Sequence, residues 1–264
     1  MKVALAQMSV KQRGYDENLA HTREFAERAA ENGADLIVFP EMFLSGFHYA
    51  ENKKVLEGGR NFATELSCIA RDAHIAICGS VCYLERLGET PSNRMLLIDS
   101  HGKLLAHYDK IHLFSVFNEH KHVKGGERIV VCDSPFGKIG LSICYDLRFP
   151  EMYVRMAQRG AQLIIVSTAW PHPRMGQLKI LARARAIDTQ AFLICVNQAG
   201  VENFGSNSVN YCGSSCLVSP TGETLAECKQ DVEDMQFCEI NLKDADKIRE
   251  KIPALRDRRP ACYF

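Results

Sequence analysis

The alternation of apolar runs with amphipathic stretches along this chain predicts a mixed α/β protein. Short, continuously apolar runs bounded by Gly, Pro or polar clusters indicate buried strands, whereas apolar residues every three to four positions indicate helices. The expected strands are Val3–Met8, Leu36–Phe39, Ile75–Tyr83, Met95–Ile98, Leu104–Tyr108, Ile129–Cys132, Ile139–Ile143, Leu163–Ser167 and Phe192–Val196, with three more near Ser215–Val218, Thr224–Cys228 and Met235–Ile240. The expected helices are Tyr15–Asn32, Asn61–Ala73, Glu151–Gln158, Leu178–Thr189 and Asp244–Lys251.

Two pairs of similar segments divide the chain into related halves. The segment Gly33–Val38 resembles Gly160–Ile165, and Gly102–Ala106 resembles Gly222–Ala226. The members of each pair are separated by a similar length of chain, and no Pro-, Gly- and Ser-rich linker interrupts it. We therefore expect one domain over residues 1–264, with two mixed sheets packed face to face and helices outside.

Composition and charge exclude several classes of protein. Hydrophobic residues make up 46% and charged residues 24%, which are ordinary values for a globular chain. Lys plus Arg (32) balances Asp plus Glu (32), which argues against a nucleic-acid or membrane-surface binder. The first apolar run, Val3–Met8, is too short for a signal peptide, and runs such as Leu163–Val166 are far too short to cross a membrane. We expect a cytoplasmic protein.

The eleven cysteines are an odd number, and most of them lie inside apolar runs. This distribution is typical of free thiols that act as small hydrophobic residues in a reducing compartment. The spacings Cys78–Cys82 and Cys212–Cys216 do not match zinc ribbons. Four histidines, His107, His112, His120 and His122, leave a metal site open as an alternative, although no recognised ligand spacing is present. No G-x-G-x-x-G or Walker motif occurs, so we expect neither a nucleotide nor any other cofactor.

Cys144 is the cysteine whose position suggests chemistry. It ends an apolar strand and precedes Pro150, a residue suited to the first turn of a helix. A strand-to-helix elbow exposes its residue near main-chain N–H groups, which stabilise a thiolate nucleophile. The alternative is one more buried thiol at the end of a strand.

Three charged residues could support such a nucleophile. Glu41 follows a buried strand, so partial desolvation should raise its pKa toward the range of a general base. Lys110 lies among apolar and aromatic residues, where its ammonium group could stabilise an oxyanion. Glu119 could hold that ammonium in place. Considered singly, Glu41 and Lys110 could equally be a rim carboxylate and a solvated surface charge.

The order and context of these residues resemble the nitrilase superfamily of carbon–nitrogen hydrolases. The glutamate follows a strand and Pro40, the lysine lies in Tyr-Asp-Lys-Ile-His-Leu-Phe at 108–114, and the cysteine lies in Ile-Cys-Tyr-Asp-Leu-Arg-Phe-Pro-Glu at 143–151. The similarity extends from Val3 to Pro260. It implies a four-layer αββα sandwich and a homodimer across which the sandwich continues, with the tail from about residue 253 packed at the interface.

The resemblance also implies a role for each site residue. Glu41 would be the general base, Lys110 the oxyanion-stabilising lysine and Cys144 the nucleophile, in a Glu-Lys-Cys triad. Glu119 matches the second glutamate of the family. The main-chain N–H of Tyr145 would be the other oxyanion donor. Neither a metal nor an organic cofactor is implied.

Softer features concern the substrate. Nitrile hydrolases carry Trp-Glu after the cysteine, and this chain has Tyr145-Asp146, which favours a linear amide. The segments 119–126, 170–174 and 182–188 are similar to the bacterial omega-amidase branch, which implies a 2-oxoglutaramate-like amide and water as the reactants. Trp170 and Phe114 are the expected pocket residues. That branch has His-Trp where this chain has Gln177-Leu178.

Several alternatives remain open from the sequence. The chain could be a deaminated glutathione amidase, an N-carbamoyl amino acid hydrolase or a nitrilase. It could also be a catalytically silent scaffold, or a metal or redox protein that uses its Cys and His residues.

Overall fold

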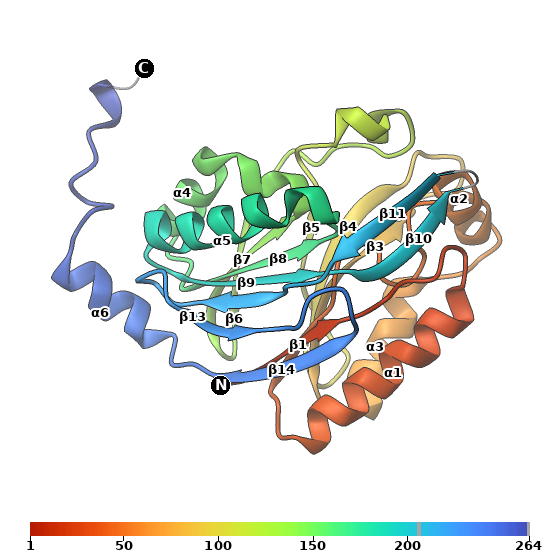
Figure 1. Ribbon diagram of the computed structural model, residues 1–264, viewed down its shortest axis with the longest axis horizontal. Helices are drawn as coiled ribbons and strands as arrows, with labels where there is room; N and C mark the ends of the chain where they lie inside the picture. The colour runs from red at the N-terminus through yellow and green to blue at the C-terminus, as the bar shows by residue number, and fades with distance from the viewer. Residues whose placement is uncertain (205–206, 263–264) are drawn as a thin grey trace.

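Two six-stranded mixed sheets form the centre of the protein, whose computed structural model describes residues 1–204 and 207–262 (Figure 1). The first sheet contains, in spatial order, β14 (Asp234–Glu239), β1 (Lys2–Gln7), β2 (Leu36–Val38), β3 (Ala76–Tyr83), β4 (Ser92–Ile98) and β5 (Leu104–Asp109). The second contains β13 (Thr224–Glu227), β12 (Cys216–Val218), β9 (Phe192–Asn197), β8 (Leu163–Thr168), β7 (Gly137–Ile143) and β6 (Val130–Ser134). A separate hairpin pairs β10 (Ala199–Phe204) with β11 (Asn207–Cys212).

Helices cover the outer faces of both sheets, which gives the expected α/β sandwich. Helices α1 and α3 lie against the first sheet and α4 and α5 against the second, as Figure 1 shows. The α-helices are α1 (Tyr15–Glu31), α2 (Tyr49–Glu57), α3 (Phe62–Asp72), α4 (Pro150–Gln158), α5 (Met175–Thr189) and α6 (Lys243–Lys251). Short 3-10 turns are η1 (Ser115–Phe117), η2 (Glu119–Lys121), η3 (Cys144–Arg148), η4 (His172–Arg174) and η5 (Pro260–Cys262).

The two sheets repeat one pattern of strand pairing. From β14 in the first sheet and from β6 in the second, successive pairs run antiparallel, parallel, parallel, antiparallel and antiparallel. Under this match β2 corresponds to β8 and β5 to β13. The similar sequence segments lead into these same strands, so the prediction of two pseudo-equivalent halves is confirmed.

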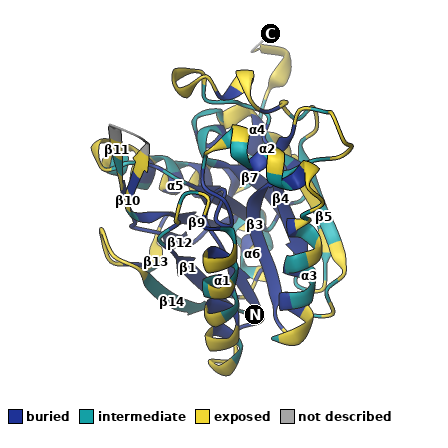
Figure 2. Ribbon diagram, turned by 90° about the vertical axis from the view of Figure 1, so that its right-hand side faces the viewer, coloured by how far each residue is buried: buried dark blue, intermediate teal, exposed yellow. Residues whose placement is uncertain are grey.

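Side chains alternate between two core layers along each inner strand. Val3 and Leu5 of β1 pack between the sheets, whereas Ala4 and Ala6 pack beneath α1. Figure 2 shows the inner strands as buried and the outward faces of the helices as exposed. Because strands covered on both faces need apolar residues at every position, they appear in the sequence as continuous apolar runs.

Two elements of the structure were not predicted. Helix α2 buries only Asn52 and Leu56, so it lacks an apolar periodicity that the sequence could reveal. The β10–β11 hairpin is rich in Gly, Asn and Ser, which favour turns over strands. At the other end of the chain, α6 and the segment after it extend away from the sandwich (Figure 1). Within the described ranges, no helix is both long and apolar enough to span a bilayer.

Candidate active site

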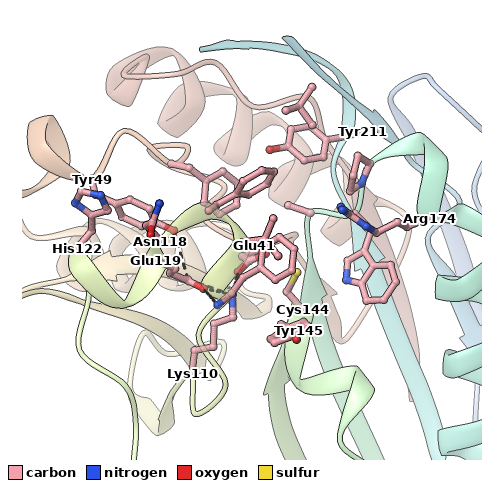
Figure 3. A pocket seen from close by; sticks show the side chains of 18 of the residues that line it. Glu41, Tyr49, Lys110, Asn118, Glu119, His122, Cys144, Tyr145, Arg174 and Tyr211 are labelled. Carbon is pink, nitrogen blue, oxygen red and sulfur yellow. Dashed lines mark hydrogen bonds and ion pairs between the residues drawn. The ribbon is translucent and has the colours of Figure 1, made fainter. Parts of the chain in front are cut away.

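A cavity of about 490 Å³ is lined by every side chain expected in the Glu-Lys-Cys site and its substrate pocket. Residues that follow β2, β5, β7 and β8 line it, because these strands end on the same side of the sandwich. The lining includes Glu41, Lys110, Phe114, Glu119, Cys144, Tyr145 and Trp170. Figure 3 shows Tyr49 and His122 at one end of this cavity and Arg174 and Tyr211 at the other.

Cys144 occupies a sharp turn between β7 and a 3-10 helix. Its φ is +48°, a left-handed conformation that costs free energy for any residue other than glycine. The turn presents the thiol to the cavity, where it makes a hydrogen bond with Glu41 and one with the main-chain N–H of Ala169. The predicted elbow is therefore present, with the turn η3 inserted before α4 begins at Pro150.

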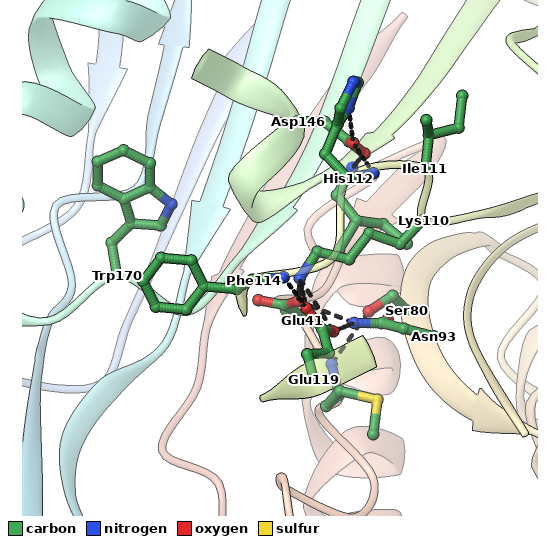
Figure 4. A network of polar contacts seen from close by, with 12 residues as sticks. Glu41, Ser80, Asn93, Lys110, Ile111, His112, Phe114, Glu119, Asp146 and Trp170 are labelled. Carbon is green, nitrogen blue, oxygen red and sulfur yellow. Dashed lines mark hydrogen bonds and ion pairs between the residues drawn. The ribbon is translucent and has the colours of Figure 1, made fainter. Parts of the chain in front are cut away.

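A buried cluster of three charges lies beside the thiol (Figure 4). The ammonium Nζ of Lys110 donates to Glu41 Oε1 at 2.8 Å and to Glu119 Oε1 and Oε2 at 3.1 and 2.9 Å. All three side chains are at most 3% exposed. Asn93 Nδ2 donates to Glu41 at 2.8 Å and to Glu119 at 3.3 Å, and the N–H of Phe114 donates to Glu119 at 2.6 Å. Asn93 was not predicted as a site residue, because it lies within a buried strand.

The surroundings divide the two carboxylates into different roles. Burial raises the pKa of Glu41, and the nearby Glu119 adds to this although Lys110 opposes it. Burial would also raise the pKa of Glu119, but Lys110 and the N–H of Phe114 lower it below the usual value. Burial would lower the pKa of Lys110, yet the two carboxylates raise it well above its ordinary range. Glu41 is thus the better proton acceptor, while Lys110 and Glu119 remain charged.

The thiol itself is protonated in this resting arrangement. Burial raises the pKa of Cys144 well above its usual value, and the charge on Glu41 raises it further. Nucleophilic attack then requires that a base take the proton as the reaction proceeds. Glu41 is in hydrogen-bonding contact with the thiol, so it is positioned to do so.

Further residues of the cavity were not predicted as functional. The ring of Tyr49 stacks on His122 with centroids 5.4 Å apart, and its hydroxyl donates to Glu119 Oε1 at 3.4 Å. Tyr211 lines the opposite wall from β11. Tyr49 and Tyr211 belong to the two elements that the sequence pattern did not reveal, which explains why neither was found.

Two arginines border the cavity in different ways. The guanidinium group of Arg148 lies 4.6 Å from the ring centroid of Trp170 and donates to Gln177 Oε1 at 2.6 Å. Gln177, which lies where the bacterial omega-amidase branch has His-Trp, thus holds Arg148 against the ring of Trp170. The guanidinium group of Arg174 lies 5.6 Å from the ring centroid of Phe114, and no acidic side chain of the described residues forms an ion pair with it.

The remaining Cys and His residues do not assemble into a site. None of the eleven cysteines is in a disulfide, and six are fully buried, as expected of core residues. His112 contacts Asp146 and His122 contacts Tyr49. Over residues 1–204 and 207–262 no three His, Cys, Asp or Glu side chains are grouped as metal ligands would be.

Comparison with known proteins identifies relatives over nearly the whole chain. The carbon–nitrogen hydrolase family model matches residues 2–250. A deaminated glutathione amidase from Dictyostelium discoideum is 33% identical over 92% of this chain and 89% of its own length. A 2-oxoglutaramate amidase from Bacillus subtilis is 32% identical over 94% of this chain and 93% of its own.

A solved structure gives the same picture. It is a variant of the amidase from Nesterenkonia sp. AN1, in which the acetamide moiety of fluoroacetamide is covalently added at the active-site cysteine. It superposes with a TM-score of 0.88 at 29% identity, over 100% of this chain and 95% of that one. This chain belongs to the carbon–nitrogen hydrolase family.

Proposed function

We propose that this chain is a cysteine-dependent amidase of the omega-amidase type, which hydrolyses the amide of a small carboxylate-bearing acid such as 2-oxoglutaramate. One observation carries the proposal: a buried ammonium group and a glutamate of raised pKa lie beside a thiol at the floor of one cavity. Proton acceptor, oxyanion donor and nucleophile are the three groups that acyl transfer from nitrogen requires.

In the proposed reaction Glu41 takes the thiol proton while the Cys144 sulfur attacks the amide carbon. The carbonyl oxygen becomes an oxyanion that Lys110 Nζ and the main-chain N–H of Tyr145 stabilise. Collapse of this intermediate breaks the C–N bond, and Glu41 returns its proton to the departing nitrogen, so that ammonia leaves and a thioester remains.

Deacylation repeats the same sequence with water as the nucleophile. Glu41 takes a proton from the water, which attacks the thioester carbonyl through a second oxyanion at the same two donors. The C–S bond then breaks, and the proton on Glu41 returns to the Cys144 sulfur. Glu119 keeps its charge throughout and holds Lys110 at hydrogen-bonding distance.

Arg174 supports a substrate that carries a carboxylate. A guanidinium group forms strong paired hydrogen bonds with a carboxylate, and this one faces the cavity without an acidic partner among the described residues. Arg148 differs because Trp170 and Gln177 already engage it. The two arginines thus provide a matched pair for testing substrate selection.

A second candidate substrate is deaminated glutathione. The cavity of about 490 Å³ has room for an amide substrate whose amine leaving group is larger than ammonia. Val116 and Phe117 line it as well, and both are more than half exposed, so they offer apolar contacts to such a portion. The relative from Dictyostelium discoideum bears the corresponding name.

The experiment compares 2-oxoglutaramate, deaminated glutathione, an N-carbamoyl amino acid and a nitrile, with loss of each substrate followed by mass spectrometry. Cys144→Ala should lower turnover of the preferred substrate by about 10⁶-fold. Arg174→Gln should raise KM for 2-oxoglutaramate at least tenfold and leave a neutral amide such as butyramide unaffected, while Arg148→Gln should not discriminate between them. Full activity of the Cys144→Ala enzyme would contradict the proposed nucleophile.

We also propose that two copies associate through α5 and the C-terminal tail. Ile180 and Ile187 on α5 are 69% and 49% exposed, and Ile252 at the start of the tail is 57% exposed. Ile180 and Ile187 are seven residues apart and so lie on one face of α5, and a contiguous exposed apolar patch marks an interface. Light scattering should give twice the chain mass for the wild-type protein. A double variant that carries both Ile180→Glu and Ile187→Glu should give the mass of a monomer.

A further inference from the structure

Asp146 lies behind Cys144, takes part in no step of the proposed reaction and yet accepts four hydrogen bonds. Its side chain is completely buried. Oδ2 accepts from the Tyr108 hydroxyl at 2.7 Å and from the N–H of Ile143 at 2.9 Å. Oδ1 accepts from the N–H of His112 at 3.1 Å and from His112 Nδ1 at 2.7 Å. In the tautomer with the ring proton on Nδ1, His112 is the donor in this last contact.

The four donors come from the two segments that hold the proposed catalytic groups. Tyr108 and His112 lie two residues before and two residues after Lys110, and the Tyr108 hydroxyl also accepts from the N–H of Ile111 at 3.0 Å. Ile143 directly precedes Cys144. A single carboxylate therefore joins the end of β5 in the first sheet to the end of β7 in the second (Figure 4).

We infer that Asp146 is a positioning residue that fixes Lys110 relative to the Cys144 sulfur and to the Tyr145 N–H. The inference rests on the proposed function, because it concerns the geometry of that oxyanion site. The turn at Cys144 has a left-handed φ of +48°, and the hydrogen bond from Ile143 to Asp146 closes it. Tyr145 stands between the nucleophile and Asp146 in the sequence of this turn.

Aromatic packing extends this support to the cavity wall. The imidazole ring of His112 stacks on Phe149 with centroids 3.7 Å apart and planes 8° apart. Phe149 contacts the ring of Tyr145 edge-on at 5.2 Å, and Tyr145 contacts Phe114 at 5.0 Å. The ring of His112 is thereby held so that its Nδ1 reaches Asp146 Oδ1.

These hydrogen bonds join the two sequence motifs at 108–114 and 143–151 into one structural unit. The motif at 108–114 supplies the donors Tyr108 and His112, and the motif at 143–151 supplies the acceptor Asp146. A small shift of an oxyanion donor costs far more in rate than in stability, since transition-state stabilisation depends steeply on distance.

Asp109 provides a matched control in the same segment. It directly precedes Lys110 and accepts three hydrogen bonds, from Ser92 at 2.8 Å and from Arg94 at 2.7 and 2.9 Å. All three donors belong to β4, in the first sheet. Asp109 therefore anchors the Lys110 segment locally, and within the described part of the chain its side chain has no hydrogen bond to the Cys144 turn.

The test compares Asp146→Asn with Asp109→Asn in the full-length enzyme on its preferred amide. The carboxamide group offers one acceptor oxygen where four donors converge, so the link between the segments is loosened. We expect kcat of Asp146→Asn to fall about 10²-fold with KM changed less than about threefold. The second-order rate of Cys144 alkylation by iodoacetamide should fall as well. For Asp109→Asn we expect kcat within about threefold of wild type.

Wild-type kcat in folded Asp146→Asn, or an equal loss in Asp109→Asn, would overturn the inference. If Asp146→Asn does not fold, Tyr108→Phe removes a single donor, and its kcat should fall about tenfold at unchanged KM. An unchanged kcat in that variant would also overturn it. Failure of the proposed function gives a different result. In that case the wild-type enzyme would not hydrolyse the amide, or Cys144→Ala would hydrolyse it as fast as wild type.

Discussion

Two buried glutamates, Glu41 and Glu202, have the same direction of pKa shift in different surroundings. Glu41 is 1% exposed and contacts an ammonium group, an amide and a thiol. Glu202 is 3% exposed, and among the described residues its carboxyl group has one hydrogen bond, from the Tyr211 hydroxyl to Oε2 at 2.8 Å. Its other oxygen has no hydrogen-bond partner among the described residues. Burial raises the pKa of Glu202 to about 8, against the effect of Tyr211.

The comparison indicates that desolvation alone does not make a glutamate a general base. Removal of water favours the neutral carboxylic acid wherever it occurs, so a raised pKa identifies burial before it identifies function. Glu41 has in addition a thiol beside it that it can deprotonate. The neighbouring Lys110 ammonium group can stabilise the negative charge that forms when the thiol loses its proton. Within the described ranges Glu202 has neither, and its hydrogen bond to the cavity wall is the one from Tyr211.

The largest expected effect separates the two glutamates by activity. Glu41→Gln should lower kcat by about 10³-fold or more, because general-base catalysis contributes about 10²–10⁴-fold. Glu202→Gln should stay within about threefold of wild type, since the amide can still accept from Tyr211. Steady-state kinetics on the preferred amide checks both. Similar losses in the two variants would show that burial, and not the neighbouring thiol, is what matters.

A smaller loss is expected when the cation is removed. Lys110→Met should lower kcat at least about 10²-fold, because one oxyanion donor disappears. It should also lower the free energy of unfolding by about 3–5 kcal/mol, since Glu41 and Glu119 are left buried without a cation. Chemical denaturation and kinetics test the two effects independently. The Lys124→Met variant is a suitable control, because its ion pair with Glu89 is exposed.

The prediction with the least effect on activity is a dependence of stability on pH at Glu202. Its pKa is about 8 in the folded protein and near 4.5 unfolded, so the folded state retains a proton that the unfolded state releases. The free energy of unfolding should therefore fall as pH rises from about 4.5 to about 8, by at most about 1.4 kcal/mol per pH unit. Glu202→Gln should lose this slope. Urea denaturation measured across that pH window would reveal it, and parallel curves for variant and wild type would contradict it.

Much of the sandwich could be predicted because its inner strands are buried on both faces. Such strands need continuous apolar runs, and the repeated segments at residues 33–38 and 160–165 indicated the two halves. Cys144, Lys110 and Glu41 were found by their order and context. Physical reasoning about any one of them alone could not distinguish it from an ordinary buried thiol or surface charge.

The parts that escaped prediction depend on contacts between distant segments. Asn93 and Asp146 resemble any polar residue in the sequence, and only folding brings them to the donors and acceptors that give them a role. Tyr49 and Tyr211 lie on α2 and β11, whose composition gives no clear periodic signal. Arg174, which has no acidic partner among the described residues, could not be distinguished from Arg148 before their neighbours were known.

The pairing of β1 with β14 has a consequence for how the protein is made. Residues 2–7 align with residues 239–234, and the amino group of Met1 donates to the carbonyl of Ile240 at 2.9 Å. During translation the first sheet therefore presents an unpaired edge at β1 until residues 234–239 have left the ribosome. This sheet carries the proposed base and the proposed oxyanion lysine, so a chain that stalls before β14 is a candidate for aggregation and for capture by chaperones.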